Sequence, residues 1–332
     1  MELNKVAESI GAINTPSVGI AGEVRCVVTK ADGTIKTDTG FQKNLILNQG
    51  LDFFGGGKGT SINASCAIGS GNSAPAITQT GLDAYIAQAS GTDNTSSYAY
   101  VDKGDNLYRV WQQRQYRFTN LANVNISEVG LVSTGTASTN YYLTTRALIK
   151  DSLGAPTSIS VKTGETLDVY YKIHKVIDTR DQAFVINVVD GNGGAVPYNV
   201  VARPVNIGGG TQSSLASSPV NISTAAEYSG AVVASGGLTS NVSVYPSGVL
   251  SSLYKAVVDS SYIKGSYKKA FSLNFGLNEA NGNIRTMAIT ASVTAWQMRF
   301  GRVSDDAPLS KTASDILEIP FEISWGRFEG TL

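Results

Sequence analysis

The stretch Leu167-Asp168-Val169-Tyr170-Tyr171-Lys172-Ile173 and the stretch Leu317-Glu318-Ile319-Pro320-Phe321-Glu322-Ile323 share one pattern of residue types. Position by position, both read apolar, acidic, β-branched, any residue, aromatic, charged and isoleucine. Alternation of apolar and polar residues is typical of a β-strand with one buried face. The return of the pattern near the end of the sequence favours two related β modules.

The surroundings of the two stretches are also alike. Each follows an Ala-Pro pair and a Lys-Thr pair, which are Ala155-Pro156 and Lys162-Thr163 in the first copy and Ala307-Pro308 and Lys311-Thr312 in the second. Further upstream, one set of residues matches another at a constant distance in sequence, namely Asn120, Ala122, Asn123, Asn125 and Ile126 against Asn278, Ala280, Asn281, Asn283 and Ile284. Because proline cannot donate to a strand ladder, Pro320 predicts an edge or bulged strand in the second copy.

Elsewhere, short strand patterns alternate with turn residues. Asp32-Gly33 predicts a hairpin turn between strands at 24–29 and 34–39. Further strands are predicted at 107–118, 125–133, 141–149, 158–161 and 167–176. The spacing of apolar residues predicts two short helices, at 48–54 and 81–89.

We therefore predict an all-β protein built from two tandem antiparallel β-sandwich-like modules, with one or two short helices in the first. The N-terminal β module, with its helices, is expected over residues 1–180. A low-charge region rich in Ser, Gly and Val, forming β-structure or an arm, is expected at 181–262. The C-terminal strands at 263–332 are expected to form one domain with that region.

The composition narrows the classes of function. The 332 residues carry 26 Lys plus Arg and 26 Asp plus Glu, and this balance argues against a surface for nucleic acid or anionic lipid. Two cysteines define no disulfide framework, and their apolar strand surroundings predict buried thiols at Cys26 and Cys66. No apolar run is long enough to span a membrane and no secretion signal is recognisable, so we expect synthesis and folding in a cytoplasm.

The low charge is concentrated in one segment. Charged residues make up 16% of the chain, against about 25% in typical soluble domains. Between Pro204 and Tyr254 the only charged residue is Glu227. Such apolar, β-forming sequence risks aggregation if left in water, so it is either covered by a neighbouring subunit or an ordinary β region within the chain. The candidate assembly residues are Val232, Val233, Leu238, Val242, Val244, Tyr245, Val249 and Leu250.

Motifs for chemistry are weak throughout. The glycine run at 55–60 lacks the order of a phosphate loop, because Lys58 precedes Gly59-Thr60 and a strand pattern follows. Residues 190–194 begin like a calcium loop without its later acidic ligands, and favour a hairpin turn. The single histidine, His174, lies on the polar face of a strand and is expected to be exposed. We predict no catalytic, cofactor-binding or metal-binding residue and no cofactor, while paired carboxylates distant in sequence stay open.

Aromatic and basic residues interleave between residues 98 and 117. Tyr98, Tyr100 and Trp111 could form a platform that stacks on sugar rings. Trp111 and Tyr108 fall on opposite faces of one strand, which instead favours a strand with one aromatic face buried. Both interpretations remain open at this point.

Six stretches carry a family resemblance: Asn44-Leu45-Ile46-Leu47-Asn48-Gln49-Gly50-Leu51-Asp52, the segment from Cys66 to Pro75, Ile126-Ser127-Glu128-Val129-Gly130-Leu131, the segment from Arg146 to Asp151, the segment from Gly164 to Val169, and the ending from Glu322 to Phe328. In these stretches the chain resembles a family of bacteriophage virion proteins, chiefly tail and tail-fibre-associated ones. The resemblance covers roughly residues 20–178 and 283–328, and it rests on packing and turn residues. Residues 179–282 depart from it.

The resemblance implies a non-enzymatic structural protein of the phage virion, in the tail at the baseplate, the collar or the fibre attachment. It would assemble with itself, in three or more copies, and with other virion proteins after synthesis in the host cytoplasm. The alternative is a receptor-binding module that contacts a host-surface glycan. An enzyme that degrades polysaccharide is less favoured, because no long β-helical repeat is visible. We expect no specific nucleic-acid partner and no membrane insertion.

Overall fold

The computed structural model describes residues 8–10, 12–56, 62–93, 105–134, 141–189, 193–205, 228–240, 246–253, 257–259, 261–291 and 295–332. Within these ranges the chain is mostly β-strand, and its one helix, α1 (Asn48–Gly56), is short. The all-β class is therefore confirmed, and so is the helix predicted at 48–54.

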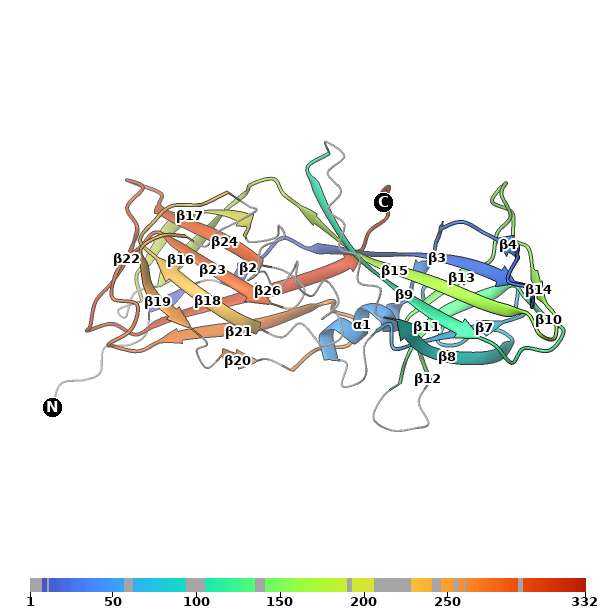
Figure 1. Cartoon of the computed structure of the whole chain (residues 1–332). Helices are drawn as coiled ribbons and strands as arrows, with labels where there is room; N and C mark the ends of the chain where they lie inside the picture. Colours follow the sequence, from blue (N-terminus) through green and yellow to red (C-terminus); the bar gives the residue numbers. More distant parts are fainter. Residues whose placement is uncertain are drawn as a thin grey trace.

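Figure 1 shows an elongated molecule with strands gathered at two ends and α1 near the middle. One end holds the strands between residues 18 and 178. Their bounds are β3 (Val18–Thr29), β4 (Ile35–Asp38), β5 (Gln42–Lys43), β6 (Leu45–Ile46), β7 (Ser65–Gly69), β8 (Tyr85–Asp93), β9 (Leu107–Phe118), β10 (Val124–Ile126), β11 (Glu128–Thr134), β12 (Tyr141–Leu143), β13 (Thr145–Leu148), β14 (Ile159–Val161) and β15 (Thr166–Asp178). We call this end the first half.

The other end, called the second half, holds the later strands together with the first two strands of the chain. Their bounds are β1 (Glu8–Ile10), β2 (Ile13–Asn14), β16 (Gln182–Val189), β17 (Ala195–Pro204), β18 (Tyr228–Ala234), β19 (Val249–Leu253), β20 (Val257–Asp259), β21 (Lys268–Phe275), β22 (Gly282–Ile284), β23 (Thr286–Ala291), β24 (Ala295–Arg302), β25 (Leu309–Lys311) and β26 (Leu317–Arg327). Buried apolar side chains from both halves join in one continuous core.

The hairpin between β3 and β4 follows from its turn sequence. Gly33 has a φ of 84°, which glycine adopts without steric cost. The Asp32 carboxylate accepts a hydrogen bond from the Thr34 N–H at 2.9 Å, as short acidic side chains in turns do. The hairpin predicted from Asp32-Gly33 is therefore confirmed.

Two long strands organise the two halves. In the first half, β15 lies between β3 and β9 and pairs antiparallel with both. In the second half, β26 lies beside β21, again antiparallel. Other strands form a second row in each half, with the order β6-β13-β11-β7-β8 in the first and β16-β17-β24-β23-β18-β19 in the second.

Pairing registers of the first half recur in the second half. Asn125 faces Ser160 in the small β10–β14 pair, and Asn283 faces Ser310 in the small β22–β25 pair. Further matching pairs are Leu167↔Phe118 and Leu317↔Phe275, Leu131↔Cys66 and Ile289↔Ala231, and Val129↔Ala147 and Met287↔Met298. Strands β7 to β11 and β13 to β15 thus have pairing counterparts among β18 to β26. Part of the low-charge segment, β18 and β19, occupies the place that β7 and β8 take in the first half.

The N-terminal strands connect the two halves. β1 and β2 pair parallel with β26, and β3 begins parallel with the end of β26 at Val18↔Trp325. β3 then continues into the first half and pairs antiparallel with β15. This geometry requires β15 and β26 to run toward the middle of the molecule from opposite ends, as Figure 1 shows. The first strands of the chain therefore lie beside its last strand.

The helix predicted at 81–89 is wrong, because this segment contains strand β8. Ile68 of β7 pairs with Ala87 of β8, and Gly91 pairs with Tyr116 of β9. The side chain of Tyr85, counted as part of an apolar helix face, is 55% exposed. Backbone pairing on both sides outweighs the weak local spacing that suggested a helix.

The edge or bulge predicted at Pro320 is also wrong. Pro320 faces Ser272 across an unbroken β21–β26 register, and β26 is an interior strand. On the other side of β26, β1 pairs up to Glu318 and β2 pairs from Phe321 onward. Pro320 lies in the interval between these two pairings, so its missing N–H interrupts neither of them.

Candidate interaction surfaces

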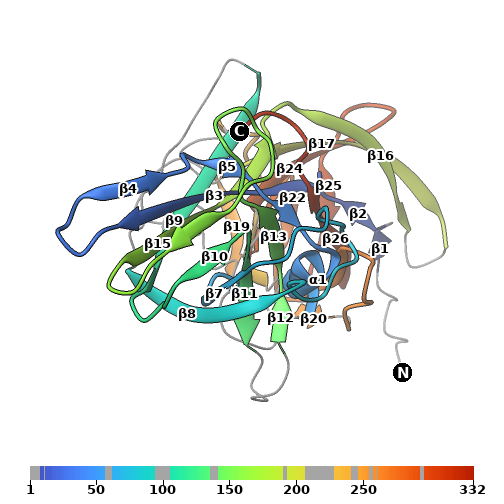
Figure 2. The same cartoon turned by 90° about the vertical axis from the view of Figure 1, so that its right-hand side faces the viewer.

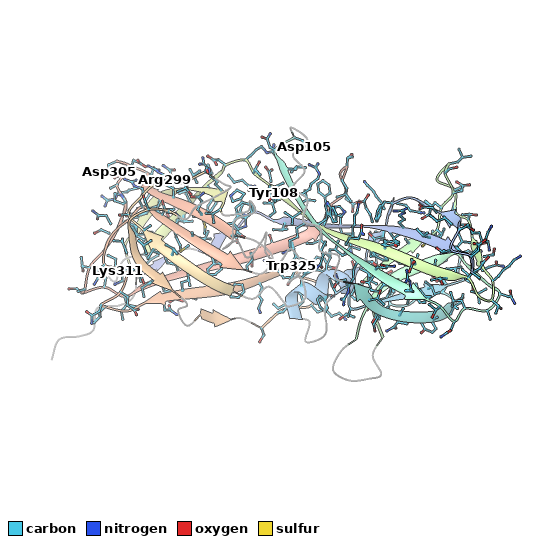
Figure 3. All side chains as sticks on the ribbon, viewed as in Figure 1. Asp105, Tyr108, Arg299, Asp305, Lys311 and Trp325 are labelled. Atoms are coloured by element: carbon cyan, nitrogen blue, oxygen red, sulfur yellow. The ribbon has the colours of Figure 1, made fainter. Side chains whose placement is uncertain are left out.

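Two stretches that are far apart in sequence, 44–52 and 322–328, meet at the middle of the molecule. Trp325, near the end of β26, donates its indole N–H to the carbonyl of Leu51 in α1 at 2.8 Å. Arg327 donates hydrogen bonds to the carbonyl of Ile46, which precedes the helix, and to the side chain of Asn48, the first residue of the helix. The label of Trp325 in Figure 3 lies beside α1, between the two halves. Residues from opposite ends of the sequence thus form one joint.

The same joint holds a loop of the second half on α1. The buried carboxylate of Asp52 accepts hydrogen bonds from the Tyr262 hydroxyl and the Gly265 N–H, both at 2.7 Å. Burial and this carboxylate raise the pKa of Tyr262. The Tyr262 ring stacks on Trp325 with centroids 6.0 Å apart. These contacts fix the two halves relative to each other through packing and hydrogen bonds.

A buried ion pair lies in the first half. Glu128 on β11 and Arg146 on β13 are both fully buried, and the Arg146 Nε lies 2.9 Å from Glu128 Oε2. The second acid, Asp83, lies 2.8 Å from Arg146 Nη2. Glu128 also accepts the backbone N–H groups of Gly71 at 3.0 Å and Ala84 at 2.8 Å. The network fastens the loop between β7 and β8.

The second half fastens its corresponding loop without charge. Thr286, which matches Glu128 by pairing register, donates its hydroxyl to the Gly236 carbonyl at 2.6 Å. Gln297, which matches Arg146, donates to the Thr239 carbonyl and accepts from the Thr239 N–H, both at 2.9 Å. Thr286 and Gln297 are fully buried. Neutral hydrogen bonds therefore replace the ion pair at an equivalent place.

Trp111 lies on the outer face of the β3-β15-β9 sheet and is half-buried. The ammonium of Lys172 lies 4.8 Å from the Trp111 ring centroid and 3.7 Å from that of Phe41. The two rings therefore hold a cation between them, worth about 0.5–2 kcal/mol. Tyr108 is buried on the opposite face, as the strand parity predicted. Tyr98 and Tyr100 lie outside the described residues.

His174 is buried, so its predicted exposure is wrong. Only 4% of its surface is accessible, and its Nε2 lies 3.0 Å from Glu23 Oε2. Trp111 and Ala21 face it from the two neighbouring strands. The rings of Trp111 and His174 are 6.5 Å apart, which explains why an outward position on this sheet is still covered.

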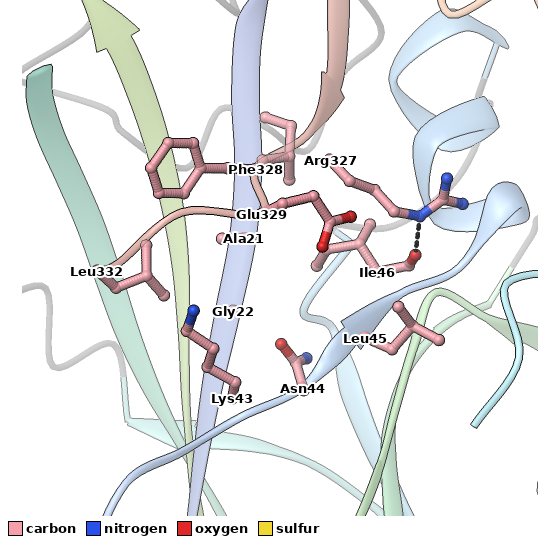
Figure 4. Close-up of a pocket in the computed structure, with 11 residues that line it drawn as sticks. Ala21, Gly22, Lys43, Asn44, Leu45, Ile46, Arg327, Phe328, Glu329 and Leu332 are labelled. Carbon is pink, nitrogen blue, oxygen red and sulfur yellow. Dashed lines mark hydrogen bonds between the residues drawn. The ribbon is translucent and has the colours of Figure 1, made fainter. Parts of the chain in front are cut away.

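A small cavity lies where β26 leaves β3. Figure 4 shows its walls, formed by β3, by residues 43–46 and by the last residues of the chain. The segment 328–332 is held there by the Phe328 N–H on the Ile20 carbonyl at 2.9 Å and by Lys43 Nζ on the Gly330 carbonyl at 2.7 Å. The cavity volume is about 40 Å³, whereas ligand pockets hold about 300–1,000 Å³. It has room for water rather than for a substrate.

The candidate assembly residues of the low-charge segment have mixed positions. Val233 is fully buried, whereas Val232 and Leu250 are half-buried and pack against the main core. Leu238 is half-buried and Val249 is 51% exposed. Val242, Val244 and Tyr245 lie outside the described residues. Among the described members of this set, only Val233 is fully buried and only Val249 is exposed.

The cysteines are buried, as predicted. Cys26 is 2% exposed and Cys66 is fully covered. Burial raises the pKa of the Cys26 thiol to about 12 and also raises that of Cys66. Of the glycine run at 55–60, Gly55 and Gly56 end α1, and the rest lies outside the described residues, as do residues 190–192. Within the described ranges, no three His, Cys, Asp or Glu side chains gather as a metal site would require.

Lys175 is a buried lysine that the sequence analysis did not single out. It is fully buried on β15, and burial lowers its pKa to about 7. A signal was present, because Lys175 continues the apolar alternation of Leu167, Val169, Tyr171 and Ile173. The ion pair of Glu128 and Arg146 carried no such signal, since its strands are short and its partners are distant in sequence.

Among the described residues, no helix has the length and apolar character needed to cross a membrane. No protein-family model, no curated protein and no solved structure matches the chain.

Proposed function

We propose that this protein is a non-enzymatic structural component of a bacteriophage virion, located in the tail at the baseplate, the collar or the fibre attachment. It acts by oligomeric assembly with copies of itself and with other virion proteins. In the same proposal the chain consists of two tandem antiparallel β-sandwich-like modules. The recurring strand registers of the two halves support that arrangement.

The observation that carries the proposal is the joint between the halves. Two stretches that resemble phage virion proteins, 44–52 and 322–328, supply its contacts through Leu51, Asp52, Trp325 and Arg327. Those contacts are packing and hydrogen bonds that hold an elongated body in one shape. A rigid joint of this kind suits a structural protein that holds its neighbours at fixed positions in a particle.

The fate of the reactive side chains also supports a structural role. The one histidine contacts Glu23 beside Trp111, and the two thiols are buried. The Glu128 carboxylate accepts hydrogen bonds from Arg146 and from backbone N–H groups. Each of these groups is used to hold the fold. We therefore propose no catalytic residue and no cofactor.

Labelling the chain in the assembled particle tests this proposal. Gold-labelled antibody, or a density tag on the exposed Leu153 loop, is expected to mark the tail in electron micrographs at a repeated position. Mass spectrometry of purified particles is expected to recover the chain in multiple copies. A chain that is absent from purified particles, while another tail protein is recovered from them, would refute the proposal.

A glycan-binding role is the second candidate, favoured by the outer face around Trp111. Phe41, Tyr170 and Trp111 are all half-buried there, with Arg25 and Lys172 between the rings. Aromatic faces beside hydrogen-bonding groups suit sugar rings. In this case Trp111→Ala abolishes glycan-array binding while the melting temperature changes little. Retained glycan binding by this variant would exclude Trp111 as a contact.

A further inference from the structure

Strand β16 has one open edge. All eight of its residues pair with β17, from Gln182↔Ala202 to Val189↔Ala195. On the other side, only Val188 and Val189 pair, with β1. In the part of the chain that the structure describes, the backbone groups of residues 182–187 on that side have no ladder partner. Figure 2 shows β16 and β17 curving along the border of the second half.

The open edge of β16 lacks the usual protection. Native edge strands carry lysine, proline, inward charges or bulges that prevent pairing with another chain. Residues 182–187 read Gln-Ala-Phe-Val-Ile-Asn, with no charge and no proline, and Val185 is 59% exposed. By contrast, edge strand β4 in the first half carries Lys36 and Asp38. The β16 edge is therefore suited to receive another strand.

We propose that a second copy of this chain occupies this edge, through antiparallel pairing of β16 with the partner's β16 around a two-fold axis at Val185. This inference rests on the proposed self-assembly and names the surface for one of its contacts. Because every second residue points its N–H and C=O outward, two identical edges match only residues of the same parity. The axis then passes through a residue, and placing it at Val185 covers the most exposed apolar side chain of the edge.

The positions of the charges favour antiparallel pairing of two copies. The nearest charged residues described, Arg180 and Asp181, both precede β16, and Asp181 is paired with Arg203. In an antiparallel arrangement these charges lie at opposite ends of the shared ladder. A parallel, in-register arrangement would place each charged residue beside the same residue of the partner. Two copies of this neutral edge can therefore pair without bringing like charges together.

The contact is small, so its strength depends on concentration. A ladder of about five residues covers less than the roughly 1,000 Å² of a stable interface. We expect a monomer–dimer equilibrium in dilute solution and firmer pairing where other contacts hold the copies together. A strand from another virion protein is the competing occupant of the edge.

Sedimentation velocity over a range of concentrations tests the pairing in the full chain. The wild-type chain is expected to form dimers as concentration rises. Val185→Lys places two ammonium groups side by side at the axis and is expected to weaken dimerisation about tenfold or more, since like charges directly opposite are destabilising. Val303→Lys is the matched control, because Val303 is a 48% exposed valine of the second half that lies outside β16 and outside the candidate assembly residues. It should dimerise like the wild type.

Cross-linking gives a second measurement that does not depend on weakening the dimer. Val185→Cys is expected to form a covalent dimer under mild oxidation, whereas Val303→Cys and the wild type, with both thiols buried, are not. A wild-type chain that stays monomeric, together with no cross-link at Val185→Cys, overturns the edge pairing. A cross-link from Val185→Cys to a different virion protein overturns the choice of occupant.

These outcomes are separate from the test of the proposed function. A monomeric, non-cross-linking chain that is nevertheless recovered from purified particles refutes only the edge pairing. A dimerising chain that is absent from particles refutes the virion role and leaves the edge pairing standing.

Discussion

The two halves fasten equivalent loops by different chemistry. The first half uses the buried ion pair of Glu128 and Arg146, and the second half uses the neutral side chains of Thr286 and Gln297. All four side chains are fully buried. The strand framework therefore accepts either solution, provided that every polar group finds a partner. The difference also offers a local explanation for the low charge around residues 228–250, because the loop there is held by the neutral side chains of Thr286 and Gln297.

The largest expected effect comes from breaking the charged anchor on one side. Arg146→Ala leaves the Glu128 carboxylate buried without its cation, and such a loss costs about 3–5 kcal/mol in free energy of unfolding. Urea unfolding followed by circular dichroism measures the change. The exposed Arg180→Ala, whose ion pair is on the surface, serves as the control and should cost less than about 1 kcal/mol.

Transplanting the neutral anchor sharpens the comparison. Arg146→Gln alone should lower the free energy of unfolding by a large part of the amount that Arg146→Ala does. Adding Glu128→Thr removes the unpaired carboxylate, so the double variant is expected to regain about 2 kcal/mol relative to Arg146→Gln. A double-mutant cycle in urea gives the coupling energy. Additive losses would show that the two halves do not use interchangeable anchors.

A second pair of matched positions lies on the two long strands. Aligned from Leu167 and Leu317, Lys175 of β15 falls at the position of Trp325 in β26. Because the pKa of Lys175 is lowered to about 7, the folded state binds fewer protons than the unfolded state between about pH 7 and pH 10. Stability should therefore rise with pH across this window.

Lys175→Met removes this pH dependence and is expected to stabilise the protein by about 2 kcal/mol at or below pH 7. The gain should shrink as the pH approaches 10, where Lys175 loses its proton in the unfolded state as well and its deprotonation on folding costs little. Thermal melts at pH 6, 8 and 9.5 measure the trend. A stability difference between wild type and variant that does not change with pH would contradict the lowered pKa.

The smallest expected effect comes from the neutral anchor itself. Gln297→Ala leaves the N–H and C=O groups of Thr239 without their side-chain partner, and the expected cost is about 1–2 kcal/mol. This is smaller than for Arg146→Ala because no charge is stranded. Equal losses from the two substitutions in urea unfolding would remove the distinction between the halves.

Local patterns were sufficient for much of the strand content. The Asp32-Gly33 hairpin, the strand 107–118 and helix α1 were predicted because short-range spacing and turn residues define them. The parity of β9 also placed Tyr108 and Trp111 on opposite faces correctly. In each case the signal lies within about ten residues.

Long-range contacts account for what the sequence did not reveal. Segment 81–89 became a strand through pairing with β7 and β9, and His174 became buried through its neighbours Trp111 and Glu23. The anchor of Glu128 and Arg146 also joins residues that only the folded sheet brings together. The repeat is visible in the sequence only where both copies have similar residues. Thr286 and Gln297 differ in type from Glu128 and Arg146, so the sequence alone did not show that these positions correspond.

The pairing of β1 and β2 with β26 sets an order of events during folding. Residues 8–14 leave the ribosome long before their partners at 317–322 are made. Such a large separation in sequence slows folding and exposes unpaired strands for longer. The first half can build β7 to β15 early, but the second half closes only when residues 8–14 pair with β26. Substitutions in residues 13–20 are therefore expected to affect the yield of folded protein and the rate of refolding more than their local contacts suggest.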